Sequence, residues 1–215
     1  MKIKNLFYKI NRNFIFTLII LIVSIFFVSC DTEITLTLQK DDSVEIRFEG
    51  GAGEAFSKMI NSATGGTGSD LLIDTSVVSY ELAMAGFENV NVQQKPNGAV
   101  LISMKDRKQT SYVFTSKIIK AEKGKLTTSI TPKSLEDFYK SSDEQTRMIL
   151  DLFLAPVFND EEMSEEEYTQ MVASFYGEAA AREIKQSIVK INLISKDGEK
   201  ESLRIPLVQL LCGNM

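Results

Sequence analysis

The chain has 215 residues, with 24 lysines and arginines, 29 aspartates and glutamates, two cysteines and no histidine. The net charge of −5 argues against nucleic-acid binding, because phosphate contacts depend on clustered basic residues. Without histidine the chain lacks the commonest general base, the usual partner of a serine or cysteine nucleophile, and the commonest transition-metal ligand.

The first thirty residues have the layout of a secretory signal. Four basic residues and no acidic residue precede an apolar run of 15 residues at 14–28. A helix of this length spans about 22 Å, whereas the hydrocarbon core of a bilayer is about 30 Å thick. The run is therefore too short for a membrane-spanning anchor, and it predicts a signal peptide at residues 1–29 that is removed.

The end of this run resembles the lipobox of bacterial lipoproteins and reads Phe27-Val28-Ser29-Cys30. The resemblance implies cleavage between Ser29 and Cys30, a diacylglyceryl group on the Cys30 sulfur and an acyl group on its amino nitrogen. The usual motif begins with Leu and has Gly or Ala before the cysteine, so Phe27 and Ser29 depart from it. The alternative is an ordinary signal peptide that ends by chance at a cysteine.

A lipoprotein of this kind is anchored to a bacterial membrane by two or three acyl chains, with its body on the extracytoplasmic side of the cell envelope. Residues 30–215 are expected to form a single domain that needs no disulfide or metal. Their net charge is about −9, because the leader holds four basic residues and no acidic one. This charge disfavours an electrostatic hold on anionic lipids, so we expect the body to stand off the membrane.

Alternation of apolar and polar residues at 33–39 and 44–48 predicts a β-hairpin around a turn at 40–43. We expect this hairpin to form the membrane-proximal edge of a sheet. Residues 54–63 carry apolar side chains at helical spacing and predict a short helix. The Gly-rich stretch at 64–70 lacks the Gly-Lys-Ser/Thr ending of a phosphate loop, so it is interpreted as a flexible connection.

A second helix is expected at 75–85, capped by Asp74 or Thr75 and stopped by Gly86. The side chains expected to face inward are Val78 and Leu82, with Met84 as a further candidate. Alternating residues at 87–92 and 99–104 then flank a Pro-Asn-Gly turn signal and predict a second hairpin.

Weaker alternation at 112–121 and 125–131 predicts two further strands around a Glu-Lys-Gly turn. After them, residues 132–186 are expected to be predominantly helical. Ser164 begins a capping-box pattern, and Gly177 is expected to break or bend the helix that follows. This helix should turn four side chains inward: Tyr168, Met171, Val172 and Phe175.

The chain returns to strands at 189–193 and 203–207, around a turn at 196–199. Pro206 has no amide hydrogen, which favours an edge position for the last strand. Strands at both ends with helices between them predict an α+β fold. In it, antiparallel hairpins share one sheet, and the helical block at about 132–186 is inserted before the C-terminal hairpin.

Two segments are similar to the LppM-type family of bacterial lipoproteins. They are ITLTLQKDDSVEIRFEG at 34–50 and ELAMAGFENVNVQQKPNGAVLISM at 81–104. Together they cover about a fifth of the chain and contain no catalytic motif, and the helical block departs from the compact family domain. The resemblance implies an anchored envelope protein of mixed strand and helix, and it adds no site residue.

An acidic cluster comprises Asp160, Glu161, Glu162, Glu165, Glu166 and Glu167. A calcium loop that starts at Asp160 would need glycine where Glu165 stands. Carboxylates in the first turn of a helix are favoured by its dipole, which explains the cluster without a ligand. Weak binding of a divalent ion is the alternative, and we predict no metal site and no cofactor.

Cys212 has no partner within the chain if Cys30 is acylated. The residue follows two leucines near the C-terminus, so we expect a small buried hydrophobe. The alternative is an exposed thiol that forms an intermolecular bridge.

Three classes of function remain. We favour a non-catalytic envelope lipoprotein that binds a protein or another envelope component. The second class is a carrier that holds an amphiphile in a pocket between sheet and helices, lined by aromatic residues that could equally form the core. These residues are Phe138, Tyr139, Phe153, Phe158, Tyr168, Phe175 and Tyr176. The third class is an enzyme, which would have to work with Ser, Lys, Asp or Glu alone.

Overall fold

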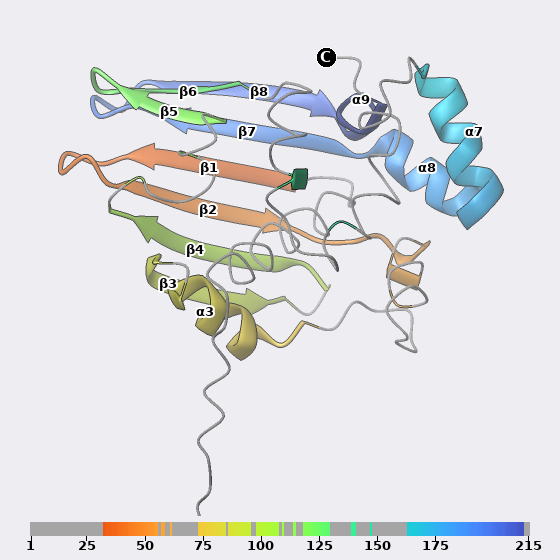
Figure 1. Ribbon diagram of the computed structural model, residues 1–215, viewed down its shortest axis with the longest axis horizontal. Helices are drawn as coiled ribbons and strands as arrows, with labels where there is room; N and C mark the ends of the chain where they lie inside the picture. Colours follow the sequence, from red (N-terminus) through yellow and green to blue (C-terminus); the bar gives the residue numbers. More distant parts are fainter. Residues whose placement is uncertain are drawn as a thin grey trace, which may run out of the picture.

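The structure is a computed structural model, and its centre is a broad mixed β-sheet (Figure 1). The C-terminal helices, in blue, gather at one end of the strands, and a further helix, in yellow, lies beside a strand at the edge of the sheet. The residues it describes are 32–55, 57–58, 61, 73–84, 86–95, 98–107, 109, 114, 118–129, 139–140, 147 and 163–212. The signal peptide at 1–29, the lipidation site Cys30, the Gly-rich stretch at 64–70 and most of the helical block before 163 lie outside these residues.

Six strands of the described chain form one sheet in the order β3-β4-β2-β1-β7-β8. Their bounds are β1 (Thr32–Leu38), β2 (Val44–Gly50), β3 (Glu88–Gln94), β4 (Val100–Asp106), β7 (Ile188–Ile194) and β8 (Lys200–Pro206). Neighbouring strands are antiparallel except for β1 and β7, which run parallel. The α+β fold is therefore confirmed, and the terminal hairpins do share one sheet.

The first hairpin forms as predicted, but its expected position at the edge of the sheet is wrong. β1 pairs with β2 on one side and with β7 on the other, so both strands of the hairpin lie in the middle. The reason is the inward row of β1, where Ile34 and Leu36 face Ile191 and Leu193 of β7. Pairing with β7 therefore continues this apolar row into the next strand, so that both strands contribute to the same hydrophobic core.

The helix α3 (Thr75–Met84) confirms the second predicted helix and its cap. The Asp74 carboxylate accepts hydrogen bonds from the backbone N–H groups of Ser76 and Val77, at 3.0 and 3.1 Å. The helix ends before Gly86, whose φ of 94° suits glycine. Val78 and Leu82 are buried as expected, but Met84 is 50% exposed, so its candidate inward position is wrong.

Two further predictions concern the segments before and after α3, a short helix and a hairpin. Residues 54, 55, 57, 58 and 61 are helical, in agreement with the short helix expected at 54–63. The hairpin of β3 and β4 is confirmed, and Lys95 donates its backbone N–H to the Ala99 carbonyl at 2.7 Å across the turn.

The next pair of strands is shorter than predicted. They are β5 (Ile119–Glu122) and β6 (Lys125–Thr128), and they form a separate two-stranded sheet. The expected strand at 112–121 starts too early, because Phe114 has helical backbone and the ladder begins at Ile119. Buried Ile119 and Leu126 attach this hairpin to the main core.

The predicted capping box opens α7 (Glu165–Tyr176). Glu167 donates its backbone N–H to the Ser164 hydroxyl at 3.2 Å, and the Glu167 carboxylate accepts the backbone N–H of Ser164 at 2.9 Å. Gly177 then ends α7, and α8 (Glu178–Gln186) follows. Tyr168 and Val172 are buried and Met171 is half-buried, but Phe175 is 76% exposed, so its inward assignment is wrong.

The C-terminal hairpin of β7 and β8 is confirmed, and β8 lies at the edge of the sheet as Pro206 indicated. The strand ends one residue earlier than predicted, because Leu207 begins α9 (Leu207–Cys212). Leu207 donates its backbone N–H to the Ser187 carbonyl at 2.9 Å, which turns the chain back toward α8. Cys212 is only 3% exposed, so the buried thiol is confirmed and the exposed one is wrong.

One hydrophobic core joins these elements on a single face of the sheet. It contains the inward residues of β1, β2 and β4 together with side chains from α3, the β5–β6 hairpin and α7 to α9. The most buried members include Leu36, Val44, Leu82, Val100, Tyr168, Ile184, Val189 and Leu207. Within the described part of the chain, no helix has the length and apolar character of a membrane span.

Candidate functional site

The opposite face of the sheet is polar, and we call it the polar face. Strand registers place every second side chain of the central strands on this side, away from the core. Its members are Glu33, Thr35, Thr37, Glu45, Arg47, Glu49, Ser103, Lys105, Lys190 and Asn192, interrupted by Leu101 and Ile194. The alternation that buries one side of β1 and β2 thus creates this surface on the other.

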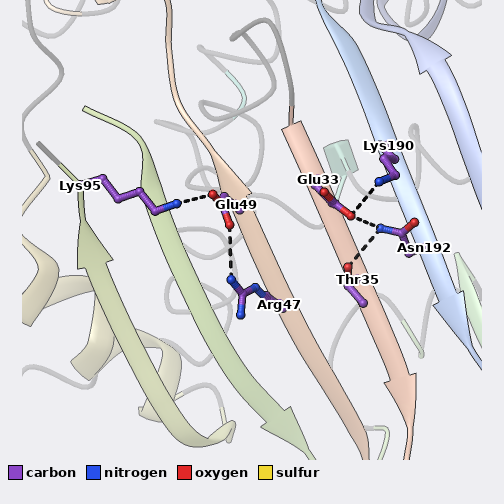
Figure 2. A network of polar contacts seen from close by, with 7 residues as sticks. All are labelled: Glu33, Thr35, Arg47, Glu49, Lys95, Lys190 and Asn192. Carbon is purple, nitrogen blue, oxygen red and sulfur yellow. Dashed lines mark hydrogen bonds and ion pairs between the residues drawn. The ribbon is translucent and has the colours of Figure 1, made fainter. Parts of the chain in front are cut away.

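Two glutamates stand side by side on the polar face, near one end of its two middle strands. Glu33 of β1 and Glu49 of β2 are directly opposite each other in the antiparallel register. Like charges in such a position repel, so each needs a cation nearby. Lys190 of β7 lies 3.0 Å from the Glu33 carboxylate, and Lys95 forms an ion pair with Glu49 (Figure 2). The result is a row of four charges across the sheet.

Arg47 adds a third cation to this row. One nitrogen of its guanidinium lies 3.4 Å from the Glu49 carboxylate, on the same strand and two residues away. The Arg47 side chain is 61% exposed, so it remains available to an incoming group. Glu49 is therefore held between Lys95 and Arg47, as Figure 2 shows.

Asn192 ties the parallel strands together from inside the polar face. The residue is fully buried, and its side-chain nitrogen donates to the Glu33 carboxylate at 2.5 Å and to the Thr35 hydroxyl at 3.2 Å. Its side-chain oxygen accepts a hydrogen bond from the Ser202 hydroxyl of β8 at 2.7 Å. A buried amide with all its strong groups paired holds its neighbours in one arrangement.

The electrostatics of the row keep both carboxylates charged. The hydrogen bond from Lys190 is the main cause that lowers the pKa of Glu33, and the hydrogen bond from Lys95 lowers the pKa of Glu49. A general acid or base needs a pKa near the working pH. The pKa values of Glu33 and Glu49 are shifted below the ordinary value of a glutamate, which is further from neutral pH. The arrangement can instead present fixed positive and negative groups to a polar partner.

The structure describes three members of the acidic cluster, of which Glu165 and Glu167 make structural contacts and Glu166 is exposed in the first turn of α7. Glu167 belongs to the capping box, and Glu165 accepts a hydrogen bond at 3.0 Å from the side chain of Gln209 in α9. Asp160, Glu161 and Glu162 lie outside the described residues. Among those that are described, no group of three or more Cys, Asp or Glu could hold a metal ion.

The aromatic residues considered for an amphiphile pocket divide into different environments. Tyr168 is fully buried in the core, and burial raises the pKa of its hydroxyl far above the ordinary value. Tyr139 and Tyr176 are half-buried against the core, whereas Phe175 points to solvent. Phe138, Phe153 and Phe158 lie outside the described residues, so the amphiphile carrier stays a prediction.

The polar face was not recognised as a site from the sequence. Its signal was present, because polar residues alternate with apolar ones in each strand. The pairing of β1 with β7 brings Glu33 next to Lys190 and Asn192, which are more than 150 positions away in the chain. Alternation alone does not specify such a pairing.

A comparison of the chain with protein-family models, curated proteins and solved structures finds no match. The similarities to lipoproteins and to the LppM-type family therefore stay predictions from the sequence. The function has to be argued from the residues and contacts of this chain.

Proposed function

We propose that this protein is a lipid-anchored component of a bacterial cell envelope that binds a protein or another envelope component without catalysing a reaction. The leader and Cys30 support the anchor, because their order is that of a lipoprotein signal. The observation that carries the binding role is the polar face, a broad surface whose charges are fixed by hydrogen bonds.

The chemistry of the polar face favours recognition over catalysis. Glu33 and Glu49 each have a lowered pKa and a lysine partner, so neither is poised to transfer protons near neutral pH. Charges that are already oriented cost little further ordering when a partner binds. A complementary pattern on the partner then provides specificity through matched and mismatched charges.

The anchor would hold this body close to the membrane. Only Asp31 separates Cys30 from Thr32, the first residue of β1, and Thr32 is fully buried. Two extended residues span at most about 7 Å. This short tether favours a sheet near the lipid surface, in contrast to the distance that the net charge of the body led us to expect.

The anchor is tested by fatty-acid labelling of the full chain in a bacterial host. We expect the unmodified sequence to incorporate the label and Cys30→Ser to lose it. Cys212→Ala is the matched control and should keep the label, because its thiol is buried and is not the acceptor. Label that persists in Cys30→Ser would contradict the anchor.

The binding role is tested by a photo-crosslinking amino acid placed at single positions in living cells. At Arg47, exposed on the polar face, we expect one discrete covalent adduct. At Lys120, exposed on β5 away from that face, we expect none. The charge reversal Glu45→Lys should reduce the adduct formed at position 47. Equal adducts at positions 47 and 120 would show that the polar face is not the contact surface.

A further inference from the structure

The helix α3 exposes an apolar stripe in addition to the side that it buries. Val77, Tyr80 and Met84 are 48%, 57% and 50% exposed. Their spacing of three and four residues places them on one side of the helix, and we call them the α3 stripe. Val78 and Leu82 occupy a different side and are 5% and 1% exposed in the core. The burial of α3 against the sheet therefore does not account for the α3 stripe.

The composition of this surface is that of a protein interface. Tyrosine and methionine are enriched in such interfaces, and charged residues are depleted from their centres. Between Thr75 and Met84 the helix has a single charged residue, Glu81, and its other exposed residues are small. Exposed apolar side chains that share one side of a helix, with a single charged residue beside them, are suited to contact with another protein.

Glu81 supplies a second, independent observation at the same place. It lies four residues after Val77 and three before Met84, so its side chain borders the α3 stripe. One carboxylate oxygen, Oε2, is buried and accepts no hydrogen bond from the described residues. A buried carboxylate oxygen without a donor is unfavourable. Rotation of the terminal torsion costs little, so either oxygen can turn toward an incoming donor.

We propose that the α3 stripe is the docking site for an amphipathic segment of a partner protein. The apolar residues of that segment cover Val77, Tyr80 and Met84, and its lysine or arginine pairs with Glu81. The surplus of acidic over basic residues in the chain favours such a basic segment. This surface is separate from the polar face, because α3 contributes to the core on the other side of the sheet.

Two other occupants fit the surface less well. A second copy of α3 would bring two Glu81 side chains together, and the helix has no basic residue to pair with them. A membrane-surface helix normally carries lysine or arginine along its polar side, and α3 has neither. The basic partner segment is the occupant that satisfies both the apolar residues and the carboxylate.

The absence of tryptophan from the chain allows a site-specific test. The protein used is residues 30–215 with the substitution Cys30→Ser, which includes every described residue. In this protein Tyr80→Trp places a single tryptophan in the α3 stripe. The probe is a tryptophan-free amphipathic helical peptide of leucine and lysine. We expect a saturable blue shift in the emission of the introduced tryptophan, and no shift with a peptide in which glutamate replaces lysine. Phe175→Trp reports on an exposed apolar position outside α3 and should not shift.

The role of the carboxylate is tested in the same background. Glu81→Gln should weaken binding of the lysine peptide about tenfold, because it removes the charge-assisted bond. Glu178→Gln changes an exposed glutamate of α8 and should leave the affinity within about twofold. Unchanged affinity in Glu81→Gln, or equal shifts with both peptides, would overturn the proposal. A blue shift without the peptide, produced by raising the protein concentration or by adding zwitterionic vesicles, would also overturn the proposal.

Discussion

At the scale of single residues, Asn192 links the strands of the polar face. Asparagine is uncommon in strands, yet this one is fully buried in β7. Its amide reaches Glu33 and Thr35 on β1 and Ser202 on β8, so one side chain connects three strands. An apolar residue here would leave the Glu33 carboxylate and the Ser202 hydroxyl with one partner fewer.

We expect Asn192→Ala to lower the free energy of unfolding by about 1–3 kcal/mol, because it removes a buried amide and its three hydrogen bonds to Glu33, Thr35 and Ser202. Urea denaturation followed by far-UV circular dichroism measures this change. Asn91→Ala is the control, because Asn91 is exposed on β3 and its loss should cost less than about 0.5 kcal/mol. Equal losses in the two variants would mean that the Asn192 contacts contribute nothing specific.

At the scale of elements, the starts of the helices were predicted more accurately than the side chains that they bury. The capping box of Ser164 and Glu167 correctly placed the start of α7, because it depends only on residues within one turn. The inward side of α7 was right at Tyr168 and Val172 and wrong at Phe175. Phe175 lies in the last turn of α7, next to Gly177, where the chain turns into α8. The main packing partner of α7 is α8 and not the sheet.

Ser164→Ala should destabilise the protein by about 1 kcal/mol, because the N–H of Glu167 loses its acceptor. Ser164→Asp should retain most of the stability, since aspartate is also a good N-cap. Ser174→Ala is the matched control in the same helix, where the hydroxyl donates to the Gln170 carbonyl and caps no helix end. Its replacement should be neutral or slightly stabilising, because alanine favours helix. A loss in Ser174→Ala as large as in Ser164→Ala would exclude a cap effect.

At the scale of the whole molecule, the parallel pairing of β1 with β7 joins the beginning and the end of the described chain. It runs from Thr32 opposite Val189 to Thr37 opposite Ile194. Because the same sheet also holds β2 to β4, neither half can complete the core without the other. We therefore expect one cooperative unfolding transition.

This cooperativity can be measured with Cys212, which is buried in α9 and is the one thiol left in Cys30→Ser. Leu36→Ala in β1 removes a core side chain that is 2% exposed and should cost about 2–5 kcal/mol. We expect this substitution to shift thiol exposure and the loss of circular dichroism to the same lower urea concentration. Lys120→Ala, at an exposed position, should shift neither. Thiol exposure well before the loss of dichroism would show that α9 unfolds separately.

Much of the architecture was determined by the sequence alone, because it depends on local physics. Alternation identified the hairpins of β1–β2, β3–β4 and β7–β8, and Pro206 indicated the edge strand. Asp74 and Ser164 correctly marked the starts of α3 and α7. Each of these signals acts within a turn or between neighbouring residues, so it can be recognised without knowledge of distant contacts.

Only the tertiary structure decided which strands became neighbours and which outward residues met. The pairing of β1 with β7 moved the first hairpin from the expected edge to the centre and brought Glu33 to Lys190 and Asn192. The packing of α3 on the sheet likewise fixed which side of that helix is buried and left Val77, Tyr80 and Met84 exposed. Contacts between distant segments depend on how all apolar surfaces are covered at once, and a local pattern does not contain that information.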